Sequence, residues 1–166
     1  MNKKIVSQTY SPSMDIQISS NFERQMFESF DRNSNKVNNA FREFYKTGNY
    51  LFSPSVIDNF KKIYDASSIS DDETLDTISK IFQKYNYISD PHTATGLKLL
   101  MDKKNDETWV SLACAHPAKF NTAVEKAIGK PTDIPIELSN LFDKKEKMTI
   151  LPNNTQEVKN YLLKNI

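Results

Sequence analysis

Residues 109–130, WVSLACAHPAKFNTAVEKAIGK, combine two kinds of periodicity on either side of one proline. The stretch 109–115 is apolar on both faces, which is typical of a strand covered on both sides. His116-Pro117 interrupts the run, and apolar residues then recur at helical spacing. In open α/β sheets, ligands bind at the carboxyl ends of strands. We therefore expect a ligand site close to Cys114 and His116.

The rest of the chain predicts a helix-rich α/β fold whose sheet is incomplete. About three strands are expected, at residues 5–10, 109–115 and 148–151. Amphipathic stripes predict seven or eight helices, with capping boxes at 20–23 and 70–73 marking two of their starts. Three strands make a thin sheet for so many helices, so the chain reads as part of a larger protein.

We interpret the 166 residues as a single region with four parts. They are a strand and active-site loop (1–19), a helical part (20–104), a strand–helix–strand part (105–152) and a terminal helix (153–166).

Composition excludes several classes of protein. A net charge of +1 favours neither nucleic acid nor an anionic membrane as partner. No apolar run is long enough for a membrane span, and the first residues do not resemble a secretory signal, so we expect a cytoplasmic protein. The three glycines, Gly48, Gly96 and Gly129, lie far apart, so the chain has no glycine-rich phosphate loop.

Four residues of metal-ligand type stand in two pairs, Asp90 with His92 and Cys114 with His116. Their i, i+2 spacing differs from that of structural zinc sites, and we expect no metal. The simpler interpretation is that Asp90 caps its helix and both histidines bond to nearby backbone. A Cys114–His116 nucleophilic pair is the other alternative, although Pro117 ends the strand that would align the two side chains.

Two further candidates have equally simple interpretations. Lys119 has the type of a Schiff-base lysine, but the first turn of a helix favours an exposed side chain rather than a desolvated one. Asn21 and Arg24 could hold an anion, or could form a surface cap or pair.

Three segments together resemble threonine synthase. They are SPSMDIQISSNFER (11–24), DPHTATGLK (90–98) and ACAHPAKF (113–120), and they follow the order of that family. The resemblance implies a fold type II enzyme that depends on pyridoxal 5'-phosphate (PLP). Such an enzyme converts O-phospho-L-homoserine and water into L-threonine and phosphate.

The resemblance covers only the carboxyl-terminal part of that family. It implies that the Schiff-base lysine and the cofactor-phosphate loop lie upstream, so no catalytic residue is expected in this chain. The partner is then the amino-terminal part of threonine synthase, which binds most of the cofactor, and the chain alone should be inactive.

The resemblance also implies roles for individual residues. Cys114 stands where the family usually has the threonine that faces the pyridine nitrogen, and His116 lies on the same cofactor side. Residues of the other two motifs are expected on the substrate side: Asp15, Ser20, Asn21, Asp90, His92 and Thr93. The alternatives to a synthase fragment are a helical interaction or regulatory module without catalysis and a related fold type II PLP lyase.

Overall fold

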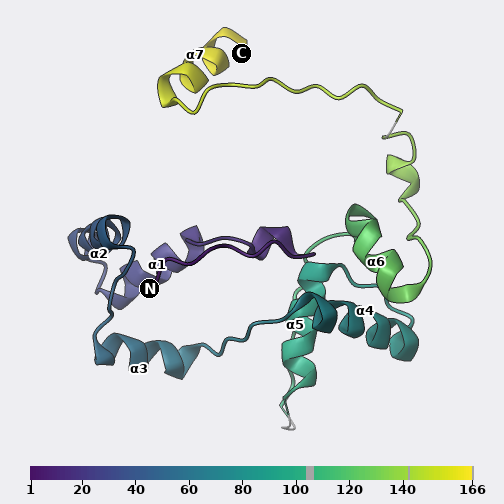
Figure 1. Cartoon of the computed structure of the whole chain (residues 1–166), viewed down its shortest axis with the longest axis horizontal. Coiled ribbons are helices and arrows are strands. Elements are labelled where there is room, and N and C mark those ends of the chain that lie inside the picture. Colours follow the sequence, from purple (N-terminus) through teal and green to yellow (C-terminus); the bar gives the residue numbers. More distant parts are fainter. Residues whose placement is uncertain (104–106, 142, 166) are drawn as a thin grey trace. The chain divides into compact units, whose positions relative to one another are not determined.

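A computed structural model describes residues 1–103, 107–141 and 143–165. Within them, helices are joined by extended segments (Figure 1). The α-helices are α1 (Ser20–Ser29), α2 (Ser34–Thr47), α3 (Pro54–Ile63), α4 (Asp71–Tyr85), α5 (Pro91–Met101), α6 (Asn121–Ile128) and α7 (Thr155–Asn165). Short 3-10 helices are η1 (Pro12–Met14), η2 (Pro117–Phe120) and η3 (Ile136–Leu138). The contacts group the chain into two compact units, Met1–Thr132 and Asp133–Ile166.

The predicted α/β class is wrong, because the described residues contain no β-strand. All three expected strands, 5–10, 109–115 and 148–151, lack regular strand pairing. Among the described residues, β-type pairing is limited to one isolated antiparallel bridge between Asn2 and Asn49. The helices therefore account for the regular structure of the described chain.

Two of the three stretches expected as strands, 5–10 and 109–115, donate backbone amides to side chains rather than to a neighbouring strand. In the first stretch, the Thr9 amide donates to Asp15 Oδ2 at 2.7 Å. In the second, the amides of Cys114 and Ala115 donate to side chains of α5. Apolar side chains in that second stretch are largely exposed, with Leu112 at 80%. Its apolar pattern therefore does not reflect burial between sheet neighbours.

Several predicted helix ends are confirmed. Ser70 caps α4 in a capping box, since its hydroxyl accepts from the Glu73 amide while the Glu73 carboxylate accepts from the Ser70 amide. Gly48 and Gly129 end α2 and α6 in the left-handed conformation that glycine favours. The capping box expected at Ser20 is wrong, because α1 begins there without a side-chain cap bond.

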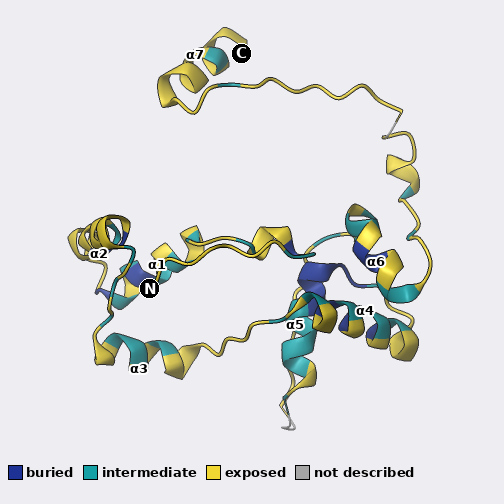
Figure 2. Cartoon of the chain, in the orientation of Figure 1, coloured by how far each residue is buried: buried dark blue, intermediate teal, exposed yellow. Residues whose placement is uncertain are grey.

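Two clusters of buried residues organise the first unit (Figure 2). The first, which we call the α1–α2 cluster, consists of Met26, Phe30, Val37 and Ala40. Around it lie partly buried aromatic side chains: Phe22, Phe27, Phe41, Tyr50 and Phe52. The second cluster lies where α4 packs against α5 and α6, and its buried residues include Ile78, Ile81, Ala94, Ala123 and Val124. The beginning of α5 is buried in this second cluster.

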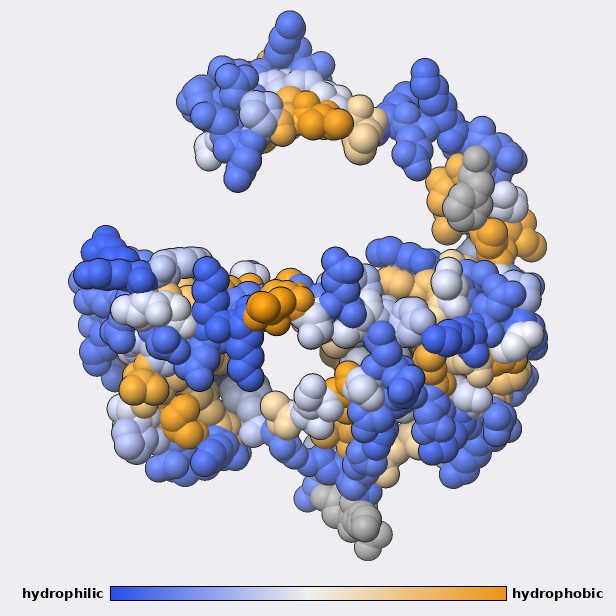
Figure 3. Space-filling view, viewed as in Figure 1, coloured by the Kyte–Doolittle hydropathy of each residue, from blue (hydrophilic) through white to orange (hydrophobic). Residues whose placement is uncertain are grey.

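The second unit contains η3 and α7, and α7 is preceded by the predicted cap at Asn154, whose Oδ1 accepts from two amides of the first turn. Apolar side chains of α7 reach the surface (Figure 3), and Leu162 and Leu163 are exposed. Two predicted limits fall outside the described residues, namely the boundary between 104 and 105 and the end of the terminal helix at Ile166. Among the described helices, none combines the length and apolar character needed to cross a bilayer.

Candidate functional site at the amino-terminal end of α5

Asp90 begins α5 as a side-chain cap, as one of the sequence interpretations held. Its backbone is extended, and Pro91 follows at the first helical position, where no amide donor is needed. Its carboxylate accepts from the amides of His92 at 3.0 Å and Thr93 at 3.3 Å. These bonds satisfy two of the amide donors that every helix start leaves unpaired.

The same carboxylate is fully buried and accepts three more hydrogen bonds. The donors are His92 Nδ1 at 2.9 Å, the Thr93 hydroxyl, and the Ala115 amide at 3.3 Å. Burial by itself would raise the pKa of Asp90, but the bonds from Thr93, His92 and Ala115 outweigh it, so the pKa lies below its usual value. Asp90 is therefore an ionised, buried acceptor that connects α5 to a segment 25 residues further along the chain.

His92 has both ring nitrogens engaged. Because an ionised carboxylate can only accept, Nδ1 carries the proton that is donated to Asp90. Nε2 then accepts from the backbone amide of Ser13 at 3.2 Å, and the ring packs against Phe120 with centroids 4.7 Å apart. An Asp–His pair can serve as a general base, but here the lone pair that would take a proton is already used by Ser13. His92 thus ties the η1 loop to α5.

Thr93 and Asp90 hold the turn that carries Cys114. The Cys114 amide donates to Thr93 Oγ1 at 2.9 Å, and the next amide, of Ala115, donates to Asp90. The Cys114 side chain itself is exposed, and its thiol makes one long contact of 3.6 Å with the Leu112 carbonyl. The backbone of this turn is therefore held by α5, while the thiol is available.

A third contact continues along the same side of α5. A Cβ on Gly96 would lie 2.8 Å from Ser111 Oγ, which is closer than side-chain atoms pack. Gly96 follows Thr93 by three residues, and Ser111 precedes Cys114 by three. Residues three apart lie on one face of a helix. The segment 111–115 therefore runs antiparallel to α5 along one face, which we call the α5 face and define by Asp90, Thr93 and Gly96.

His116 and Lys119 belong to the following turn. His116 caps η2, since its Nδ1 accepts from the Ala118 amide at 3.2 Å, and its side chain is exposed. Lys119 is also exposed, with its ammonium 5.6 Å from the centroid of the Phe120 ring. As expected, Lys119 lacks the desolvated setting of a reactive lysine.

The four metal-type residues are thus only partly brought together. Asp90 and His92 bond each other directly and lie beside the backbone of Cys114, whereas His116 bonds within its own turn. In the part of the chain that the structure describes, no group of three or more His, Cys, Asp or Glu side chains is arranged to hold a metal ion.

Asp15 lies in the loop after η1. Its two carboxylate oxygens accept from the amide and the hydroxyl of Thr9, at 2.7 and 2.8 Å. The Ser11 amide in turn donates to that Thr9 hydroxyl at 3.1 Å, and Ser11 is buried. Asp15 therefore shapes the loop that His92 contacts through Ser13.

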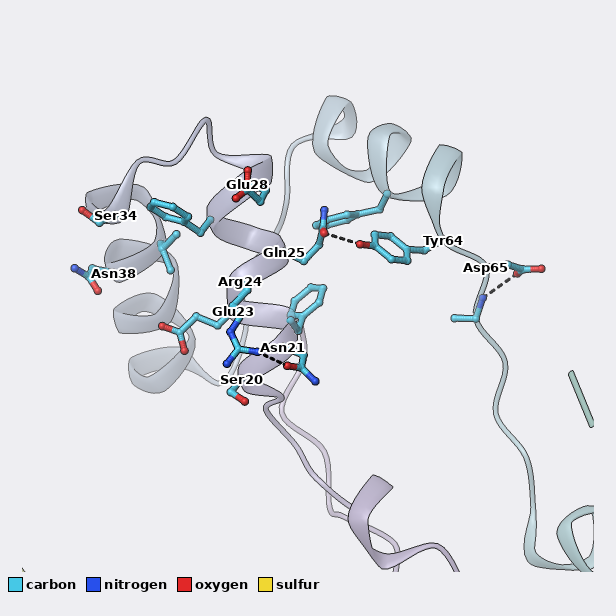
Figure 4. Close-up of a pocket in the computed structure, with 15 residues that line it drawn as sticks. Ser20, Asn21, Glu23, Arg24, Gln25, Glu28, Ser34, Asn38, Tyr64 and Asp65 are labelled. Carbon is cyan, nitrogen blue, oxygen red and sulfur yellow. Dashed lines mark hydrogen bonds between the residues drawn. The ribbon is translucent and has the colours of Figure 1, made fainter. Parts of the chain in front are cut away.

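Ser20 and Asn21 line a different pocket, formed mainly by α1, α2 and α3 (Figure 4). Arg24 donates to Asn21 Oδ1 at 2.6 Å, so the two side chains form a local surface pair. Acidic residues also line this pocket, namely Glu23, Glu28 and Asp65. That charge balance does not favour the binding of an anion by Arg24.

Sequence reasoning did not find Ser13, Gly96 and Ser111 as partners in this region. Ser13 lies inside the motif of residues 11–24, but it contributes a backbone amide, which any residue except proline could supply. The close approach at Gly96 had one signal, a glycine within a helix, where glycine is destabilising unless something packs against it.

Comparisons with known proteins place the chain in a family. A family model for the carboxyl-terminal part of threonine synthase matches residues 93–162. Threonine synthase of Pseudomonas aeruginosa is 34% identical over 164 residues, covering 97% of this chain and 35% of that protein. Threonine synthase of Schizosaccharomyces pombe is 36% identical, covering 82% of this chain and 31% of that protein. The chain belongs to the threonine synthase family.

Solved structures agree with the sequence comparison. PLP-bound threonine synthase from Brucella melitensis superposes with a TM-score of 0.83 at 37% identity, covering 97% of this chain and 35% of that one. The yeast threonine synthase structure gives a TM-score of 0.80 at 33% identity, covering 99% and 38%. This chain corresponds to the carboxyl-terminal region of the family and spans about a third of its relatives' length.

Proposed function

We propose that this chain forms the carboxyl-terminal part of a complete threonine synthase, a PLP-dependent enzyme of fold type II that acts in the cytoplasm. The enzyme would convert O-phospho-L-homoserine and water into L-threonine and phosphate. The observation that carries the proposal is the likeness to PLP-bound threonine synthase over 97% of this chain, with a TM-score of 0.83.

The residues present fit one edge of the cofactor. Cys114 offers an exposed thiol on a turn whose backbone is held, which suits a weak donor beside the pyridine nitrogen. The cofactor's phosphate needs clustered glycines, whereas Gly48 and Gly129 end helices and Gly96 packs inside α5. In this proposal the phosphate loop comes from the amino-terminal part. The family resemblance places the cofactor lysine there as well, so the chain alone would be inactive.

When bound, PLP supplies the electron sink that the elimination of phosphate requires. The protein's own contribution here is orientation. Cys114 would lie beside the ring nitrogen, while His116 shapes the turn from the extended segment into η2. Residues of the other motifs, Asp15, Asp90, His92 and Thr93, order the substrate side by holding the η1 loop against α5. Ser20 and Asn21 belong to the substrate side in this proposal through their motif alone, because in this chain they line a separate pocket.

A chimera tests the proposal directly. This chain replaces the matching third of Pseudomonas aeruginosa threonine synthase, and phosphate release from O-phospho-L-homoserine is measured. We expect activity within about 100-fold of the parent, because a misplacement of about 1 Å at the seam can cost that much. The parent lacking that third is the control and should be inactive. A folded, PLP-loaded chimera without activity, or activity from this chain alone, would contradict the proposal.

Position 114 gives a finer test in the same chimera. A hydroxyl is a stronger donor than a thiol, so Cys114→Thr should raise kcat by about fivefold, which corresponds to one modest hydrogen bond. Cys114→Ala removes the donor and should lower kcat. Equal kcat values for all three side chains would mean that residue 114 does not act on the cofactor.

A further inference from the structure

We propose that Asp90 and Thr93 are positioning residues that set the place of Cys114 by holding its backbone. This inference rests on the proposed function, since it concerns how the cofactor-side residue is presented. Neither side chain needs to touch the cofactor or the substrate for this role. Both act through the two amides of the Cys114–Ala115 turn, and Asp90 acts also through the orientation of the Thr93 hydroxyl.

The segment that carries Cys114 needs hydrogen bonds to fix its position, because its side chains are largely exposed. Leu112 and Val110 are about four-fifths exposed, and Cys114 is exposed as well. A chain in this setting gains little from apolar burial and keeps much conformational freedom unless its amides are bonded. The bonds to α5 therefore have a large share in fixing the direction of the thiol.

Asp90 controls the direction of the hydrogen bond at Thr93. A hydroxyl has one hydrogen to donate and two lone pairs. Because the Asp90 carboxylate can only accept, the Thr93 hydrogen goes to Asp90, and the oxygen is left to accept from the Cys114 amide. The buried charge of Asp90 thus orients the Thr93 hydroxyl, and the hydroxyl oxygen holds the amide of residue 114 in place.

Asp90 also couples this turn to the η1 loop. The proton on His92 Nδ1 goes to Asp90, and this leaves Nε2 free to accept from the Ser13 amide. One carboxylate therefore sets the hydrogen-bond direction on both sides, toward Cys114 through Thr93 and toward Ser13 through His92. Loss of the Thr93 hydroxyl should free only the Cys114 amide. Loss of the Asp90 charge should weaken the hydrogen bonds of both the Cys114 turn and the Ser13 amide.

The test measures backbone amide hydrogen exchange by NMR in the full chain of residues 1–166. Thr93→Val keeps the side-chain shape and removes the hydroxyl, so the Cys114 amide should exchange about tenfold faster while the Ser13 amide stays unchanged. Asp90→Asn should speed exchange at Cys114, Ala115 and Ser13 together. Thr93→Ser restores the hydroxyl and should restore slow exchange at Cys114.

Thr95→Val is the matched control for the Cys114 amide, because the partners of the Thr95 hydroxyl are the His92 carbonyl and Met14 Sδ of the η1 loop rather than the 111–115 segment. Circular dichroism of each variant checks that the helices persist. Unchanged exchange at Cys114 in folded Thr93→Val would overturn the proposal. Faster exchange in Thr95→Val to the same degree would also overturn it, since the effect would then be a general loosening of α5.

The chimera with Pseudomonas aeruginosa threonine synthase separates positioning from mere support. Thr93→Val should lower kcat with little change in KM, and Thr93→Ser should recover kcat. If Thr93→Val speeds exchange of the Cys114 amide but leaves kcat unchanged, the hydrogen bond from this amide to Thr93 has no part in the reaction, and the positioning role is wrong. An inactive parent chimera would instead refute the proposed function and the positioning role with it, while the exchange data would still show whether α5 holds the turn.

Discussion

The α1–α2 cluster and two residues of the α5 face, Asp90 and Thr93, are buried, but opposite chemistry holds the two regions together. Met26, Phe30, Val37 and Ala40 pack apolar atoms, and neighbouring rings add contacts such as the tilted pair of Phe30 and Phe52, whose centroids lie 6.3 Å apart. The α5 face instead relies on a buried carboxylate with five donors. Apolar packing is tolerant of direction, whereas hydrogen bonds to one charge impose direction on every partner.

That difference suits different tasks. The apolar cluster can stabilise α1 and α2 without placing any atom accurately, because many residues of similar volume would fill it. The start of α5 fixes the positions of particular backbone amides: the Cys114 amide lies 2.9 Å from Thr93 Oγ1, and the Ser13 amide lies 3.2 Å from His92 Nε2. Under the proposed function, the η1 loop and the Cys114 turn serve the substrate and the cofactor, and both are attached to the second kind of structure.

The largest loss of unfolding free energy is expected for a substitution in the α1–α2 cluster. Met26 is fully buried, so Met26→Ala should lower the free energy of unfolding by about 3 kcal/mol through lost burial and a cavity. Urea denaturation followed by circular dichroism measures it. The exchange rate of the Cys114 amide under native conditions should stay as in the parent chain. Faster exchange of the Cys114 amide in Met26→Ala would mean that the α1–α2 cluster and the α5 face unfold together.

A smaller effect with a distinct pH dependence is expected for Asp90→Asn. At pH 7 the loss of charge-assisted bonds should cost about 2 kcal/mol of unfolding free energy. The pKa of Asp90 is lowered in the folded chain, so its stabilisation is present above the ordinary aspartate pKa of about 3.9 and is lost as pH falls through the lower folded pKa.

The measurement is urea denaturation of parent and variant at pH 7 and near pH 2. The cost of Asp90→Asn should shrink at the acidic pH, while the cost of Met26→Ala should not change, because no titrating group lies in the Met26 substitution. If Asp90→Asn lowers the unfolding free energy equally at both pH values, the charge of Asp90 does not stabilise the fold.

The smallest effect is expected for Gly96→Ala. The added Cβ would meet Ser111 Oγ at 2.8 Å, so either the segment or the hydroxyl must shift, at a cost of about 1 kcal/mol. Amide chemical shifts of residues 111–115 should change more than those of α2. Adding Ser111→Ala removes the clashing oxygen and should return the shifts toward the parent values. If it does not, the close approach at Gly96 is not what aligns the segment.

Sequence reasoning was most successful for local features. The Ser70 capping box, the glycines that end α2 and α6, and the proline starts of α3 and α5 all depend on residues within one turn of each other. It failed for the strands, because an apolar run such as 109–115 is compatible with a strand but cannot show which group its amides will meet. Asp90 was recognised as a cap, but not as the acceptor for Ala115.

By itself, the sequence determined several helix ends, the motifs that mark the threonine synthase family, and the absence of clustered glycines for a phosphate loop. Capping, helical periodicity and glycine spacing are short-range properties, so they can be read along the chain. Only the tertiary structure decided that Asp90 joins Ser13, through His92, to the Cys114 turn, and that Gly96 makes room for Ser111. These contacts join residues that are distant in sequence. In the hydrogen bonds among them, Ser13, Cys114 and Ala115 contribute backbone amides, which carry no residue-specific signal.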